Sequence, residues 1–199
     1  MDLEWAVLVA AISAWATLFI GLITRDLVKR QFEEQFESNK KQHQVQGLLE
    51  AFKILDKEDH REFRKTVFIQ YFEYFENGDV KVFKHNAVAN VMADFDIMGK
   101  LVKSNNIDRD EFLEEYGSLA YRCWKCLEDH IIHEREERKF PPFMTWFEWL
   151  AKEGYKYWKE GHKPQGYDFD DTVLFHPHDP AKKIDFRSKP KWKGKGSPI

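Results

Sequence analysis

The hydrophobic positions divide the chain into an uncharged N-terminal run and a longer part with helical periodicity. From Trp5 to Ile23 no residue is charged, and the polar side chains inside the run are Ser13 and Thr17. A helix of this length rises about 28 Å at ~1.5 Å per residue, close to the roughly 30 Å hydrocarbon core of a bilayer. A buried helix of a soluble protein would normally carry a polar stripe. The pattern therefore predicts a transmembrane anchor over residues 1–24.

A cleaved signal peptide is the alternative interpretation, because residues 14–16 resemble a small-x-small cleavage site. The segment before the run is acidic rather than basic, however, with Asp2 and Glu4, and mostly apolar residues follow the site. Basic residues follow the run directly, namely Arg25, Lys29 and Arg30. By the positive-inside rule we expect a bacterial inner-membrane protein with its N-terminus outside and its C-terminal domain in the cytoplasm.

Small side chains recur at a spacing of three and four within the predicted span. They are Ala6, Ala10, Ser13, Ala14, Thr17 and Gly21. Such ladders let membrane helices approach closely, so we expect the chain to form a homo-oligomer through this face. Several spans around an axis, with Ser13 and Thr17 inward, would line a pore, whereas a lone span would not. The alternative is that small residues are simply common in membrane helices.

The rest of the fold is predicted to be all-α, with a mostly irregular C-terminal tail. Residues 25–46 are expected to continue the span as a stalk helix, with Val28, Phe32 and Phe36 forming a thin apolar stripe suited to a short coiled coil. Residues 47–160 are expected to form a cytosolic helical domain because their apolar positions have a period near 3.6. The helices predicted there cover 47–55, 58–76, 83–103, a long segment from Asp108 to Pro141, and 145–160. Asp108 with Glu111 resembles a capping box.

Residues 161–199 lose this periodicity and gain Gly and Pro, and within them only residues 172–175 could form a short strand. The last twenty residues contain seven Lys or Arg against one Asp. Candidate contacts with phosphate or lipid are Arg187, Lys189, Lys191, Trp192, Lys193 and Lys195. Such a tail suits an anionic membrane surface, or a nucleic-acid phosphate with Trp192 stacked on a base. A solubilising tail is the simpler alternative.

Composition excludes several classes of protein. The 199 residues hold 31 Lys or Arg against 34 Asp or Glu, for a net charge of −3, which excludes a general nucleic-acid coat. Ten Gly and two Cys exclude a collagen-like chain and a disulfide scaffold. Two thiols agree with a reduced, cytosolic domain.

The residue types that bind metals or catalyse reactions give weak patterns. Cys123, Cys126, His130 and His133 fall near one helix face, but the first and last would lie about 15 Å apart, too far to share an ion. We therefore predict no metal and no cofactor. Phosphate-binding, dinucleotide-binding, serine-hydrolase and zinc-protease motifs are missing, and Arg122 and His130 do not match the Arg–His spacing of HEPN ribonucleases. The chain is not expected to be an enzyme.

A cluster of charges at the end of the predicted long helix is the best candidate for ligand binding. If the last helix folds back, Arg135, Arg138 and Lys139 would meet Trp124 and Trp146. A pocket of arginine and aromatic side chains suits a nucleotide or oligonucleotide. The alternative is a solvated surface of salt bridges.

Several parts of the sequence carry a family resemblance. They are residues 90–108, Trp124, Arg135 and the segment Trp146–Leu150, and together they resemble an uncharacterised family of short bacterial membrane proteins. The resemblance covers roughly residues 1–160 and implies one N-terminal helix followed by a helical cytosolic domain. It implies no catalytic residue. The architecture is also similar to that of small membrane effectors of anti-phage systems, which pair a short membrane part with a cytosolic sensor.

Two functions follow as hypotheses. The first is a sensor-effector that oligomerises and permeabilises the membrane in response to a cytosolic signal such as a nucleotide. The second is a non-catalytic, membrane-tethered scaffold that docks a cytosolic protein partner. A tethered nuclease or hydrolase would need a catalytic constellation that the sequence does not offer.

Overall fold

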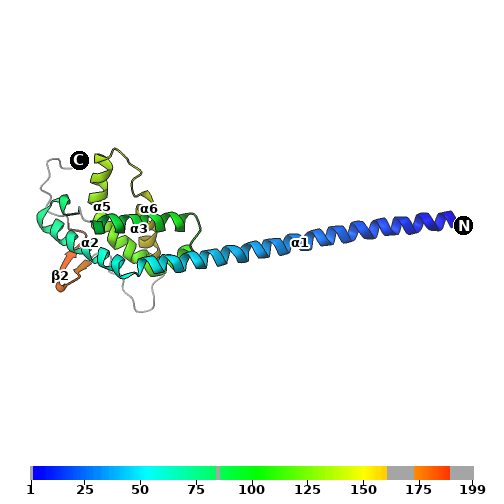
Figure 1. Cartoon of the computed structure of the whole chain (residues 1–199), viewed down its shortest axis with the longest axis horizontal. Helices are drawn as coiled ribbons and strands as arrows, with labels where there is room; N and C mark the ends of the chain where they lie inside the picture. The colour runs from blue at the N-terminus through cyan, green and yellow to red at the C-terminus, as the bar shows by residue number, and fades with distance from the viewer. Residues whose placement is uncertain (1, 84–85, 161–172, 189–199) are drawn as a thin grey trace. The chain divides into compact units, whose positions relative to one another are not determined.

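The computed structural model describes residues 2–83, 86–160 and 173–188, without most side chains before Thr24 (Figure 1). The chain divides into two compact units, Met1–His43 and Gln44–Ile199, which are treated separately below. The described residues are mostly helical, as their periodicity predicted.

The first helix, α1 (Asp2–Leu55), contains the described part of the first unit and the first residues of the second. No Gly or Pro occurs between Thr24 and Gln46, so nothing in that segment opposes a helix. Gly47 does not end the helix either. A Cβ at Gly47 would lie 2.7 Å from the backbone oxygen of Asn106, so glycine is needed there because the loop after α3 passes close by.

The second unit is built around one core, to which α2 (Glu58–Asn77), α3 (Asn86–Lys103), α5 (Ser118–Glu137) and α6 (Thr145–Lys159) contribute (Figure 1). α6 packs on both α3 and α5. At this meeting point Phe147 stacks on Phe95, with 5.3 Å between ring centroids, and meets Trp124 edge-on at 5.3 Å. Phe95 and Phe147 are fully buried, and burial of each such side chain stabilises the fold by about 1.5–3 kcal/mol.

The capping prediction at Asp108 is confirmed. Its carboxylate accepts the backbone N–H groups of Asp110 and Glu111, and α4 (Arg109–Phe112) starts there. The long helix expected after it is not regular, because a π-helical turn, η2 (Leu113–Gly117), precedes α5. The indole N–H of Trp158 donates to the carbonyl oxygen of Leu113 at 3.0 Å, so a side chain of α6 satisfies the backbone of the widened turn.

Further along, β1 (Val173–His176) pairs antiparallel with β2 (Asp179–Asp185). One strand was predicted here, and the second was missed because Asp, Pro and Lys disfavour strands. Leu174 and Ile184 are buried, which anchors the hairpin on the core. From α2, Tyr71 meets Phe186 at 5.8 Å between ring centroids.

Candidate functional site

The strongest candidate site lies at the α5–α6 corner, defined here as residues 132–148. Pro141 and Pro142 prevent α5 from continuing, because proline has no backbone N–H to donate. Lys139 and Met144 adopt positive φ angles of 51° and 55°, which are uncommon for residues other than glycine. The corner is a tight reversal that brings α6 back onto α5, which is the condition under which the charged cluster was expected to approach the two tryptophans.

Arg135 ties the α5–α6 corner together. Its Nε donates to the carbonyl oxygen of Phe143 at 2.8 Å, and its guanidinium lies 2.9 Å from a carboxylate oxygen of Glu148 on α6. The guanidinium carbon also lies 5.9 Å from the ring centroid of Trp124. The structure thus brings Arg135 and Trp124 together, and two of the guanidinium nitrogens of Arg135 contact protein oxygens.

Glu148 pairs with two cations at the corner. Besides Arg135 it binds Lys152, whose Nζ lies 2.6 Å from its second oxygen. The hydrogen bond from Lys152, followed by that from Arg135, lowers the pKa of Glu148 below its ordinary value, although burial opposes the shift. The carboxylate is therefore held ionised, and it neutralises the positive charge that would otherwise attract a phosphate.

The other predicted ligand residues occupy separate positions. Arg138 pairs with Glu134 at 2.7 Å and covers the ring of Phe143, with its guanidinium carbon 4.6 Å from the ring centroid. Trp146 lies at the start of α6, where its backbone N–H binds Asp96 at 3.0 Å and its side chain is partly exposed. Lys139 is exposed at the turn.

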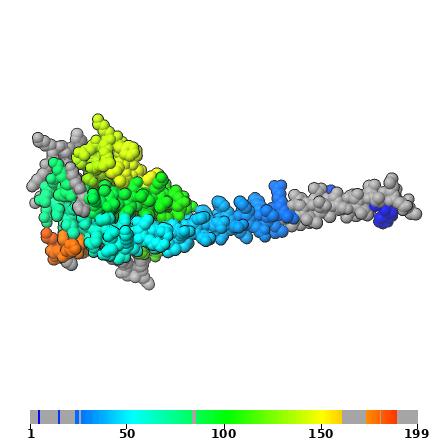
Figure 2. Space-filling model, viewed as in Figure 1, coloured from blue at the N-terminus to red at the C-terminus, as the bar shows by residue number. Residues whose placement is uncertain are grey.

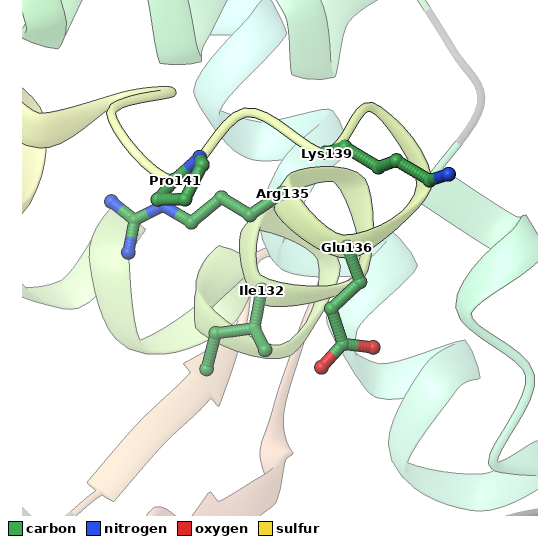
Figure 3. Close-up of a pocket in the computed structure, with 5 residues that line it drawn as sticks. All are labelled: Ile132, Arg135, Glu136, Lys139 and Pro141. Carbon is green, nitrogen blue, oxygen red and sulfur yellow. The ribbon is translucent and has the colours of Figure 1, made fainter.

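A shallow pocket of about 520 Å³ opens on the outer side of the corner (Figure 3). Its lining comprises Ile132, Arg135, Glu136, Lys139 and Pro141. Figure 3 shows the charged ends of Arg135, Glu136 and Lys139 pointing in different directions. Their charges do not converge on one point, so the pocket as it stands does not form a phosphate cradle.

In the C-terminal hairpin, Arg187 forms a two-pronged contact with Asp185, at 2.9 Å and 2.5 Å. These hydrogen bonds lower the pKa of the Asp185 carboxyl to about 2. The nearby pocket of about 440 Å³ is lined by Phe75 of α2 together with hairpin residues. The remaining tail candidates, Lys189, Lys191, Trp192, Lys193 and Lys195, lie outside the described residues.

The assembly face predicted for the span also lies outside the side chains that the structure describes. This applies to Ala6, Ala10, Ser13, Ala14, Thr17 and Gly21. Within the described part of the chain, no helix is both long enough and apolar enough to cross a membrane.

The cysteines and histidines of α5 belong to the core and its edge. Cys123 and Cys126 are free thiols and fully buried. Burial raises the pKa of Cys123 to about 12 and that of Cys126 well above its ordinary value. Among the described residues, no group of three or more His, Cys, Asp or Glu side chains could hold a metal ion.

Two contributors to the corner were missed by sequence reasoning. Asp96 on α3 accepts the N–H groups of Trp146 and Phe147, both at 3.0 Å, and so caps α6 from another helix. Glu148 belongs to the segment Trp146–Leu150 that carries the family resemblance, but the sequence did not predict that it pairs with Arg135. An acidic residue in the first turn of α6 was the available signal, because a carboxylate is favoured at a helix N-terminus.

The fold and the corner define a small helical domain in which Arg135 and Arg138 pair with carboxylates of the same domain. Residues 5–154 match a family described as a domain of unknown function, DUF4760, and the chain belongs to that family. This confirms the resemblance to an uncharacterised family. No curated protein and no solved structure matches the chain.

Proposed function

We propose that the chain is a membrane-anchored sensor-effector that oligomerises and permeabilises the bacterial inner membrane when its cytosolic domain receives a signal. The observation that carries the proposal is the uncharged run from Trp5 to Ile23, followed at once by Arg25, Lys29 and Arg30. The family match begins at residue 5, so the run is part of what the family shares. A basic tail near the membrane would add about 1 kcal/mol of attraction per Lys or Arg at an anionic surface.

The α5–α6 corner is the surface on which we propose that the signal acts. Arg135 and Arg138 supply the cations that a nucleotide phosphate would use, whereas Trp124, which is 5% exposed and packed on Phe147, has no free aromatic face. A nucleotide phosphate would have to compete with Glu148 for Arg135. Such competition would loosen the contact between α5 and α6. Ligand binding would in this way change how the two helices pack.

The test uses vesicles that contain the full-length protein and a trapped dye. Thr17→Leu combined with Gly21→Leu enlarges two of the predicted small contacts. Ile12→Leu combined with Phe19→Leu is the matched control, because these positions fall outside the small-residue pattern. We expect the wild type and the control to release dye, and the Thr17/Gly21 variant to lose most of the release. Equal release by all three proteins would show that this face does not assemble a pore.

An anti-phage role is the biological context that we propose, by analogy of architecture with small membrane effectors. Cells that carry the wild-type chain should survive phage challenge better than cells that carry the Thr17/Gly21 variant. Equal survival would separate the protein from such defence, whatever its effect on vesicles.

A tethered scaffold is the second candidate, and one feature of the corner favours it. Arg135 and Arg138 are already paired, while Ile132, Phe140 and Trp146 expose 44%, 53% and 37% of their surfaces. Exposed apolar and aromatic side chains are typical of protein contacts. A scaffold should tolerate the Thr17/Gly21 substitutions and fail when Phe140→Ser removes the more exposed of the corner's two exposed aromatics, with helix content unchanged.

A further inference from the structure

The described part of α1 in the first unit has one face without charge. At 100° per residue, this face covers an arc of about 140° that includes Val28 and Phe32, while Phe36 lies about 40° beyond its edge, between Arg25 and Lys29. We call it the uncharged seam, and its members are Leu27, Val28, Gln31, Phe32, Gln35, Ser38, Asn39 and Gln42. All eight side chains are exposed, and those of Leu27, Val28 and Phe32 are 54%, 57% and 69% exposed. The segment 27–42 that carries them is drawn in shades of blue in Figure 2.

Every charged residue between positions 25 and 42 falls outside the uncharged seam. They are Arg25, Asp26, Lys29, Arg30, Glu33, Glu34, Glu37, Lys40 and Lys41. Lys29 and Glu33 form an i,i+4 pair at 3.8 Å on this side, with both side chains well exposed. The charged side is thus an ordinary solvated helix surface. Solvation alone does not explain why the uncharged residues are gathered on the other side.

We propose that the uncharged seam binds the same seam of a second copy of the chain, in parallel and in register. In such a symmetric pair each residue meets its own counterpart, so any charge in the seam would meet a like charge. Amide side chains have both a donor and an acceptor and can pair with themselves, which suits Gln35, Asn39 and Gln42. In the sequence the same spacing continues at Val45 and Leu49, which are 54% and 53% exposed in the second unit.

A lipid surface fits the uncharged seam less well. Burying amides and hydroxyls in an apolar phase without partners costs free energy. Helices that lie on membranes also tend to carry an excess of Lys and Arg on their polar face. The charged side of this segment, by contrast, holds five basic and four acidic residues, which is no clear excess of positive charge. An antiparallel pair would bring different residues together, so it would not require a seam free of charge.

The contact depends on the proposed membrane anchoring for its strength. The uncharged seam has three apolar residues and several amides, so a coiled coil of this length is weak on its own. Two copies anchored in one membrane meet at a high effective concentration, which compensates for weak contacts. The parallel orientation follows from the same anchoring.

The test is cysteine cross-linking of the full-length protein in vesicles. Val28→Cys, Gln35→Cys and Gln42→Cys place one thiol each on the uncharged seam, and Lys29→Cys, Glu33→Cys and Glu37→Cys are matched controls on the charged side. The native cysteines are buried, and the unmodified protein serves as the blank. With a copper–phenanthroline oxidant, we expect each seam variant to form disulfide dimers at least about tenfold faster than its control.

Three outcomes would overturn the proposal. Equal rates on both sides would mean random collisions, and no dimer at any seam position would mean that the uncharged seam is not an interface. A third outcome is dimers that form between Val28→Cys and Gln42→Cys mixed together but not within either sample, which would mean antiparallel pairing. Dye release measured on the same vesicles keeps the two proposals apart. Cross-linking without dye release would support the seam contact and contradict the pore. Dye release without cross-linking would support the pore and contradict the seam contact.

Discussion

Gly154 on α6 lies so close to Gly117 that a Cβ at position 154 would be 2.3 Å from the carbonyl oxygen of Gly117. A Cβ at Gly117 would meet the Cα of Gly154 at 3.1 Å, which is tight but less severe. The two glycines let α6 contact the π-helical turn backbone to backbone, next to the hydrogen bond from Trp158 to Leu113.

We therefore expect Gly154→Ala to destabilise the protein by about 1–3 kcal/mol, because the added methyl forces the backbones apart. Gly117→Ala should cost less. Lys156→Ala, on the exposed side of α6, is the control and should change stability by less than about 0.5 kcal/mol. Urea unfolding followed by circular dichroism measures all three. A harmless Gly154→Ala would contradict the close approach.

The cap of α6 by Asp96 gives a second prediction. The residue at the N-cap position itself, Met144, offers no side-chain acceptor, so Asp96 satisfies the N–H groups of Trp146 and Phe147 from α3. Asp96→Ala should cost about 0.5–2 kcal/mol of stability, and Asp96→Asn less, because its amide oxygen can still accept. Thermal unfolding distinguishes the two. If Asp96→Ala unfolds like the wild type, the two hydrogen bonds do not support α6.

The helices could be predicted from the sequence because their signals are local. The 3.6-residue period located α2, α3, α5 and α6, and Asp108 marked a helix start through its own side chain. The end of α5 followed from the two prolines after it. These features depend on residues within a few positions of each other, which is what pattern analysis reads.

The features that were missed depend on residues far apart in the chain. The π-helical turn at Leu113–Gly117 receives its hydrogen bond from Trp158, and β2 is paired with β1 and carried by the core through Ile184. At the candidate site, Arg135 lies near Trp124, one of the contacts considered for a folded-back last helix. The pairing of Arg135 with Glu148 and with the carbonyl of Phe143 was not, because it depends on the geometry of the turn.

Arg135 and Arg138 should differ in their effect on stability although they are three residues apart. Arg135 is mostly buried and joins α5, the turn and α6, whereas Arg138 is 56% exposed and pairs within α5. Removal of Arg135 leaves the carbonyl of Phe143 without this donor, so Arg135→Ala should cost about 1–3 kcal/mol. Arg138→Ala should cost less than about 1 kcal/mol. Equal, small effects in urea unfolding would mean that Arg135 is free to serve a ligand instead.

His130 should make stability depend on pH. Its ring is buried against Phe83, with 5.4 Å between ring centroids, and its Nδ1 has no hydrogen-bond partner among the described residues. Burial lowers the pKa of His130, while Glu134 opposes the shift and His133 adds to it. The unfolded chain therefore binds more protons than the folded one between the lowered pKa and the ordinary value of about 6.5.

It follows that this contribution to the free energy of unfolding is present above about pH 6.5 and is lost as the pH falls through the lowered pKa of His130. Stability measured from pH 8 to pH 5 should fall in the wild type and fall less in His130→Phe. His178→Gln, at an exposed side chain of the hairpin, is the control and should keep the wild-type slope. A His130→Phe variant with an unchanged slope would assign the pH dependence to another group.

The two thiols should be unreactive until the domain unfolds. The thiolate is the nucleophile, and burial raises the pKa of Cys123 to about 12 and that of Cys126 well above its ordinary value. At pH 8 the folded protein should react with Ellman's reagent far more slowly than the protein in urea, which should show both thiols at once. Gln35→Cys, whose added thiol is on the exposed stalk, should show one fast equivalent in the same assay. Rapid reaction of Cys123 or Cys126 in the folded protein would contradict the burial of these two thiols.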